Sequence, residues 1–230
     1  MRPVDSHCHL QFEQFDEDRE KVVDEVEKTL EFAVLAGINP KDNQKAVKLS
    51  KTSESLKYCL GLHPLHYKKS VKTARNQIKK NNPVAVGEIG LDYNYITDKE
   101  ERRDSEKVFR EMLNIAENQG LPVVVHSRNA EEKCFDIVNE YEVEAFFHCF
   151  NGRPELAEKI ASSGHMVGVT NQVTHSTRVQ NIMEKIRVES ILTETDSPYL
   201  SGDRNRPVNV LKVVEKIADI KGLGVSEVME

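Results

Sequence analysis

The chain has 230 residues, of which 38% are hydrophobic and 30% are charged, and its formal net charge is −6. This composition excludes fibrous, membrane-spanning and wholly disordered proteins, and the length suits one α/β barrel, which commonly takes roughly 200–250 residues. The acidic balance also argues against a protein that holds nucleic acid on a broad basic surface.

Short apolar segments with the character of buried strands recur along the chain, and a charged segment with helical periodicity follows each. Strands are predicted at residues 3–5, 32–36, 58–61, 84–88, 122–126, 145–148, 166–169 and 191–195. Runs such as Val84-Ala85-Val86 are apolar at every position, which is typical of parallel strands that helices cover on both faces.

Helices are predicted at residues 16–30, 42–55, 70–81, 99–118, 130–141, 154–163, 176–187 and 207–220. The first places Val22, Val23 and Val26 on one face, with charged residues around the rest. Eight such alternations fit a closed (β/α)8 TIM barrel more simply than an open doubly wound sheet. Because the sequence has no linker or low-complexity tract, residues 1–230 are predicted to form a single domain, with a short final helix from about Ser226.

The cysteines and the apolar segments predict where the protein works. The four cysteines are scattered and form no CxxC pair, as in reduced intracellular proteins. The longest apolar runs are far below the ~20 residues of a membrane span, and the start of the chain does not resemble a signal peptide. We therefore predict a soluble, cytoplasmic protein that does not bind membranes. With no Trp, eight Phe and six Tyr, the chain has little from which to build a base-stacking platform.

Six potential metal ligands end or follow predicted strands. His7 and His9 would point to the same side of an extended strand, although an isolated pair could equally be surface or capping histidines. The other four are Glu88, His126, His148 and Asp196. Each alone could be a capping group or a core residue, but the parallel strands of a barrel would gather all six at the C-terminal mouth, where barrel enzymes place their active sites.

The number of these ligands indicates two metal ions. Four imidazoles and two carboxylates exceed what one tetrahedral ion uses, and they match a pair of ions bridged by a carboxylate. Histidine with carboxylate suits Zn²⁺ or Mn²⁺, and Mg²⁺ stays open. A paired site of this kind activates water for hydrolysis.

Several motifs together resemble the signature blocks of the TatD family of metal-dependent deoxyribonucleases, in the amidohydrolase superfamily. They are DSHCHL from Asp5, GLHP from Gly61, GEIGLDY from Gly87, HSR from His126, HCF from His148 and ETDSPYL from Glu194, in the family's order. The resemblance implies a TIM barrel and hydrolysis of DNA phosphodiesters, often from the 3′ end. It also implies that one ion is held by His7, His9 and Asp196, and the other by His126 and His148, with Glu88 as the bridge.

Four further residues are candidates for substrate contacts. His63 and His66 could touch a phosphate or be structural, and Arg128 could do so or be a solvated charge. Arg204, in a turn that resembles the family's Arg-Asn-x-Pro, could pair with substrate or brace the loop of Asp196, and bracing is favoured. Glu194 is expected to orient a ligand.

Three functions are compatible with these residues. DNA hydrolysis leads, with Glu88 and Asp196 as catalytic residues, DNA as the substrate, no stable protein partner and a monomeric state. The alternative is an amide or ester hydrolase of the same superfamily, such as a deacylase or lactonase. Those relatives often bridge their metals with a carbamylated lysine at the end of strand four, where this chain has Glu88 and the nearest lysines, Lys80 and Lys99, are distant. A barrel that binds without catalysis would predict a missing ligand, and none is missing.

Overall fold

Eight parallel strands alternate with helices in the computed structural model, which describes residues 2–229. The strands pair in the order of the chain: β1 Val4–Cys8, β2 Phe32–Gly37, β3 Leu56–Leu60, β4 Ala85–Asp92, β5 Val123–Arg128, β6 Ala145–His148, β7 Met166–Val169 and β8 Ile191–Thr193. The helices are α1 Arg19–Thr29, α2 Pro40–Ser50, α3 Val71–Asn81, α4 Lys99–Glu117, α5 Glu131–Val138, α6 Pro154–Ser162, α7 Thr177–Lys185, α8 Val210–Lys221 and α9 Val225–Val228. This is the (β/α)8 topology, and the predicted fold class is confirmed.

The chain divides into two compact units. The terminal unit holds residues 2–35, 49–57 and 149–229, and the central unit holds residues 36–48 and 58–148. That residues 1–230 act as one domain stays a prediction.

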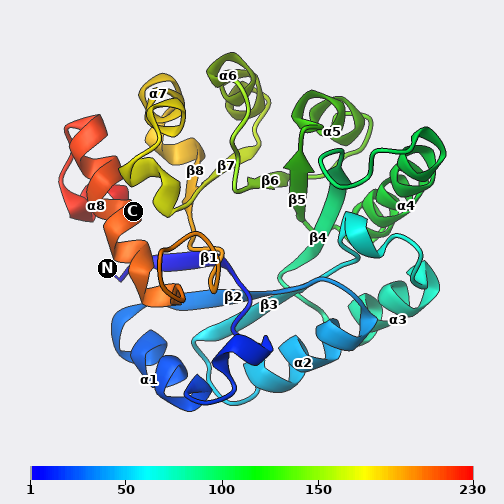
Figure 1. The fold of residues 1–230 in the computed structure, drawn as a ribbon, viewed down its shortest axis with the longest axis horizontal. Coiled ribbons are helices and arrows are strands. Elements are labelled where there is room, and N and C mark those ends of the chain that lie inside the picture. Colours follow the sequence, from blue (N-terminus) through cyan, green and yellow to red (C-terminus); the bar gives the residue numbers. More distant parts are fainter. Residues whose placement is uncertain (1, 230) are drawn as a thin grey trace. The chain divides into compact units, whose positions relative to one another are not determined.

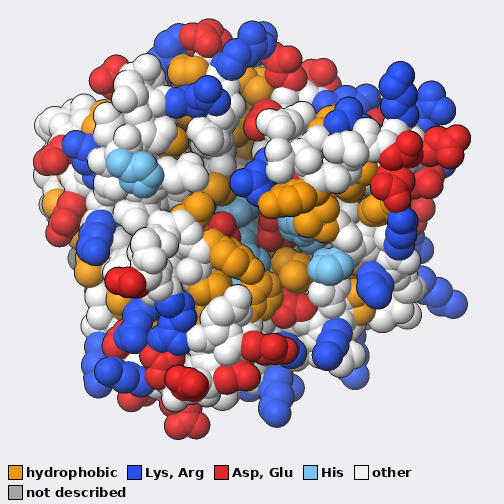
Figure 2. Space-filling view, viewed as in Figure 1, with side chains coloured by type: hydrophobic (Ala, Val, Ile, Leu, Met, Phe, Trp, Pro, Cys, Tyr) orange, Lys and Arg blue, Asp and Glu red, His pale blue; other side chains and the backbone are white. Residues whose placement is uncertain are grey.

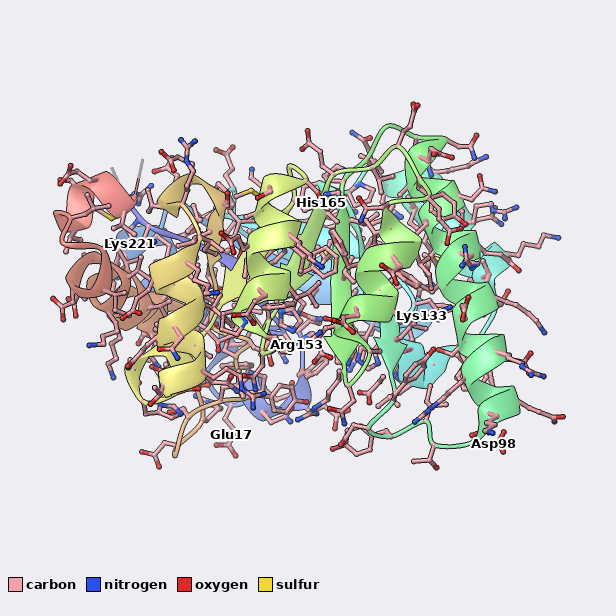
Figure 3. All side chains as sticks on the ribbon, turned by 90° about the horizontal axis from the view of Figure 1, so that it is seen from above. Glu17, Asp98, Lys133, Arg153, His165 and Lys221 are labelled. Carbon is pink, nitrogen blue, oxygen red and sulfur yellow. The ribbon has the colours of Figure 1, made fainter. Side chains whose placement is uncertain are left out.

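In the terminal unit, helices α6, α7 and α8 lie side by side (Figure 1). Helix α8 buries Val210, Val213, Val214 and Ile217, the stripe that its sequence predicts. Strand β1 pairs with β2 and also bridges to the segment after β8, at Cys8 and Ser197. In Figure 3, Arg153 lies at the start of α6 and His165 beyond its end, as a helix antiparallel to the strands requires.

In the central unit, β4, β5 and β6 are neighbours, and α4 packs against β4 (Figure 1). Helix α4 begins after Asp98, whose side chain accepts hydrogen bonds from the backbone N–H groups of Glu100 and Glu101. Its inner face buries Phe109 and Met112, among other apolar residues. Asp98 marks this start of α4 in Figure 3.

Several boundaries differ from the predicted ones. Strand β1 extends to Cys8 and β4 to Asp92, beyond the apolar runs that predicted them, because polar residues continue the sheet pairing. Helix α2 starts at Pro40, whose fixed φ suits a first helical position. The start of the last predicted helix is a 3₁₀ turn, Pro207–Asn209, before α8. The short helix expected near Ser226 is α9, and its predicted end at Glu230 lies outside the described residues.

Lys, Arg, Asp and Glu side chains of both signs are interspersed over the visible surface (Figure 2). Among residues 2–229, no helix combines the length and the apolar character that a membrane crossing requires. The four cysteines, all within the described residues, form no disulfide.

Candidate metal centre

A bulge in β1 sets the direction of the first histidine. Asp5 pairs with Ala33 and Cys8 with Leu35, so three steps along β1 match two along β2. Such an extra residue re-aims side chains and is frequent beside active sites. His7 lies inside this bulge and is fully buried, and His9 follows the end of the strand.

His7, His9 and Asp196 form the first cluster, in the terminal unit. The two Nε2 atoms are 3.3 Å apart, and Oδ1 of Asp196 lies 3.8 Å from Nε2 of His7 and 3.5 Å from Nε2 of His9. The backbone N–H of Asp196 donates to the carbonyl of His7 at 2.9 Å, which ties the loop after β8 to β1. The sequence prediction that the two imidazoles face the same side is therefore confirmed.

These distances fit a metal ion. With metal–ligand bonds of about 2.0–2.2 Å, adjacent ligand atoms of a tetrahedral site are roughly 3.3–3.6 Å apart. The ligand atoms of the two imidazoles and the one carboxylate in this cluster lie 3.3–3.8 Å from one another. It could accept an ion with small adjustments of the side chains.

Asp5 holds the backbone next to Asp196 in place. Its carboxylate accepts hydrogen bonds from the backbone N–H and the hydroxyl of Thr195, at 2.9 and 2.6 Å, one residue before Asp196. Burial raises the pKa of Asp5 to about 8, against the opposing effect of those hydrogen bonds. Nearby, the fully buried Glu194 accepts a hydrogen bond from the backbone N–H of Cys149 at 2.5 Å, which fixes the start of the loop after β6.

A second bulge, in β4, positions Glu88 in the central unit. Val86 pairs with Val123 and Ile89 with Val125, so β4 again carries one extra residue. The strand runs unusually close to β5: a Cβ on Gly90, whose φ is +142°, would lie 1.9 Å from the carbonyl oxygen of His126. Only glycine permits this approach, which brings Glu88 beside His126.

Glu88, His126 and Asp92 form the second cluster. Nδ1 of His126 lies 2.8 Å from Oε1 of Glu88, and its Nε2 lies 3.0 Å from Oδ2 of Asp92. Burial disfavours the imidazolium, but the hydrogen bonds with Asp92 and Glu88 outweigh it and raise the pKa of His126. Burial likewise opposes ionisation of Asp92, but its hydrogen bonds with His126 and with backbone N–H groups lower its pKa.

His63 adjoins the second cluster. Its Nδ1 accepts a hydrogen bond from the backbone N–H of Leu65 at 3.1 Å, so the neutral ring carries its proton on Nε2, which lies 3.4 Å from Oε1 of Glu88. Burial lowers the pKa of His63 to about 3, so the ring is neutral. Although His63, Glu88 and His126 have ligand atoms close enough to share an ion, this tautomer makes His63 a donor.

The remaining predicted residues lie at the C-terminal end of a strand or in the segment that follows it. His148 ends β6 and pairs in register with His126 on β5. His66 ends the 3₁₀ turn Pro64–His66, with its ring 6.3 Å from that of His63. Arg128 ends β5, is exposed, and lies 5.6 Å from the ring of Tyr95.

Arg204 contacts the segment that follows β1. Its guanidinium donates to the carbonyl of Gln14 and to Asp18, both at 2.5 Å, and lies 4.8 Å from the ring of Phe15. These contacts join the turn at Arg204 to residues 14–18, and whether Arg204 braces the loop of Asp196 or pairs with substrate stays a prediction.

Sequence analysis gave no role to Asp92 or Asp5. A signal for Asp92 was present, because Glu88 and Asp92 are four residues apart in one strand and side chains at even spacing share a face. Asp5 and His7 also have an even spacing, since they lie two residues apart in β1. Both residues hydrogen-bond to a potential ligand or to the loop that carries one, and neither belongs to the predicted set of ligands.

Fold and clusters together define a class: a (β/α)8 protein whose strand ends carry His and carboxylate groups able to bind metal. Within that class the chain belongs to the TatD family, because the sequence model described as TatD related DNase matches residues 4–230. The protein is therefore a member of a family of metal-dependent hydrolases.

Individual relatives agree with this assignment. An uncharacterized metal-dependent hydrolase of Methanocaldococcus jannaschii is 37% identical over 238 residues, covering 100% of this chain and 93% of that protein. The deoxyribonuclease TATDN3 of Homo sapiens is 30% identical over 247 residues, covering 99% of this chain and 90% of that protein. A crystal structure of a TatD homologue from Escherichia coli matches the fold with a TM-score of 0.89 at 24% identity, covering 99% of this chain and 93% of that one.

Proposed function

We propose that this protein is a TatD-type deoxyribonuclease, a hydrolase that cleaves DNA phosphodiester bonds from the 3′ end with two divalent ions, Zn²⁺, Mn²⁺ or Mg²⁺. One observation carries the proposal: His7, His9 and Asp196 lie at the mutual spacing of metal ligands. The human relative named a deoxyribonuclease supports the choice of substrate. We further propose a monomer that acts in the cytoplasm, with DNA as its partner.

The proposed ligands are the three residues of the first cluster, Glu88 and His126 of the second, and His148 at the end of β6. His7, His9 and Asp196 would hold one ion, His126 and His148 would hold the other, and the carboxylate of Glu88 would serve both. Bound divalent ions lower the pKa of water and offset negative charge on a phosphoryl oxygen.

The other steps fall to side chains. The carboxylate of Asp196, which is partly exposed, would take the proton of the attacking water. The Nε2–H of His63 would donate a hydrogen bond to a substrate oxygen, because its Nδ1 already accepts the N–H of Leu65. Arg128, His66 and Arg204 are proposed as weaker substrate contacts, with Arg204 acting chiefly through Asp18 and the loop before α1.

The alternative is an amide or ester hydrolase of the same superfamily. Strand β4 carries a glutamate and no lysine, so the carbamylated lysine of many such enzymes has no counterpart there. This favours phosphodiester hydrolysis, and the two functions separate in one assay.

Metal-free protein is reconstituted with single ions and given end-labelled single- and double-stranded DNA. We expect a product ladder that shortens from the 3′ end with at least one of these ions. Asp196→Asn keeps the size of the side chain but cannot take a proton, so we expect DNA binding and at least one metal to be retained while cleavage falls by roughly 10²-fold or more. A folded, metal-loaded and fully active Asn variant would refute the role of Asp196, and esterase activity without DNA cleavage would favour the alternative.

A further inference from the structure

An exposed aromatic side chain lies beside the first cluster. Tyr199 keeps 46% of its surface exposed, and its ring centroid lies 6.1 Å from that of His9 and 6.4 Å from that of Phe12, in edge-on geometry. Phe12 in turn stacks face to face on His9, with centroids 4.5 Å apart and an interplanar angle of 13°. The three rings form a continuous aromatic group that ends at a proposed metal ligand.

The backbone fixes Tyr199 relative to Asp196. The N–H of Tyr199 donates to the carbonyl of Asp196 at 2.9 Å, closing a turn through Ser197 and Pro198. The N–H of Asn205 donates to the carbonyl of Pro198 at 3.0 Å, and the Asn205 side chain donates to the carbonyl of Thr195 at 3.0 Å. The loop is thus held on both sides of Tyr199, so little ordering of the backbone is needed when a ligand binds against the ring.

Exposure next to the cluster distinguishes Tyr199 from ordinary surface residues. Leu65, Val84, Tyr95 and Val225 are also large and exposed, and scattered residues of this kind need no explanation. Tyr199 differs because its ring contacts a proposed metal ligand and its backbone is bonded to another. A planar ring at this place suits a planar group of the substrate.

We propose that Tyr199 is a substrate-binding residue whose ring stacks on an unstacked nucleobase next to the scissile phosphate. This inference rests on the proposed function. Base–aromatic stacking tolerates any base, but both faces of a base inside a duplex are already covered by its neighbours. The small aromatic content of the chain excludes a long stacking platform, whereas one anchored ring is enough for one unstacked base.

The test separates stacking from hydrolysis by changing both the ring and the base. Tyr199→Leu keeps apolar bulk and removes the aromatic face, and Tyr199→Phe is the matched control that keeps it. Each protein is assayed on a short oligothymidylate and on an oligomer of equal length whose sugars carry no bases. Binding of both oligomers is also measured by fluorescence anisotropy in the Asp196→Asn background, which keeps them intact.

For the Leu variant we expect KM and Kd for the oligothymidylate to rise about 5- to 30-fold, with kcat within about threefold of the wild type. The Phe variant should match the wild type, and all three proteins should treat the baseless oligomer alike. Equal affinity of wild type and Leu variant for oligothymidylate, or an equal loss on the baseless oligomer, would overturn the proposal. If the wild type cleaves neither oligomer, the proposed function fails, and the binding data still decide on the stacking.

Discussion

Replacing Asp92 by Asn should disable His126 through a shift of one proton. Oδ1 of Asp92 accepts hydrogen bonds from the backbone N–H groups of Asn94 and Tyr95 at 3.0 and 2.9 Å, and Oδ2 faces Nε2 of His126 at 3.0 Å. An Asn must keep its carbonyl oxygen on those two N–H groups, so its NH₂ faces His126. Because an NH₂ only donates, Nε2 must then accept, and in the neutral ring, the form that binds a metal, the one proton sits on Nδ1.

That proton would occupy the nitrogen needed for metal binding. Nδ1 lies 2.8 Å from Oε1 of Glu88, so the shifted proton gains a hydrogen bond there and stays. Loss of a partner that orients a metal-binding histidine typically lowers metal affinity or activity by about 10- to 100-fold, equivalent to about 1.4–2.7 kcal/mol. We expect a loss of metal affinity near the upper end of this range. The new tautomer places a proton on the lone pair of Nδ1, whereas loss of the partner alone would only remove the hydrogen bond that orients the ring.

The assay is a competition titration with a chelator of known affinity, together with ¹⁵N chemical shifts of the His126 ring. Asp92→Ala leaves Nε2 to water, so it should lower metal affinity less than Asn while destabilising the turn at residues 93–95 more. Asp42→Asn is the control: Asp42 is also buried in the central unit, where its side chain accepts from the N–H of Ile38 at 3.1 Å. It should lower stability and leave metal affinity unchanged. An Asp92→Asn protein with wild-type metal affinity and the proton still on Nε2 would refute this reasoning.

Three further predictions address the bridge, the strand and the loop. Glu88→Gln removes the charge proposed to serve both ions, so hydrolysis should fall by at least ~10²-fold at matched metal content, and near-normal turnover would exclude the bridging role. Gly90→Ala places a Cβ against the His126 carbonyl, so thermal unfolding should show a loss of roughly 1–3 kcal/mol together with weaker metal binding; an unchanged melting temperature would contradict the close approach. The side-chain hydrogen bond from Arg204 lowers the pKa of Asp18, so their pairing stabilises the fold above the ordinary carboxyl pKa and is lost as the pH falls through the lowered value. Asp18→Asn should therefore lower stability by roughly 0.5–1 kcal/mol at pH 7 and by progressively less as the pH falls below the ordinary carboxyl pKa, and a difference independent of pH would argue against the ion pair.

The sequence by itself determined the fold class, the family and the candidate ligands. Unbroken apolar runs such as Val123–Val125 predicted buried parallel strands, and the stripe of Val210, Val213 and Ile217 predicted the inner face of α8. These features are local, since the period of apolar residues depends only on the geometry of a strand or helix. The motifs added the order of the ligands along the chain.

Only the tertiary structure decided which groups meet. The bulges of β1 and β4, and the continuation of β4 to Asp92, depend on pairing with a neighbouring strand, which no periodicity within one strand reveals. The partners of His126 and the tautomer of His63 follow from that pairing and from a backbone N–H that lies close by. The position of Tyr199 beside His9 joins residues 190 positions apart, and such a contact is a property of the folded chain.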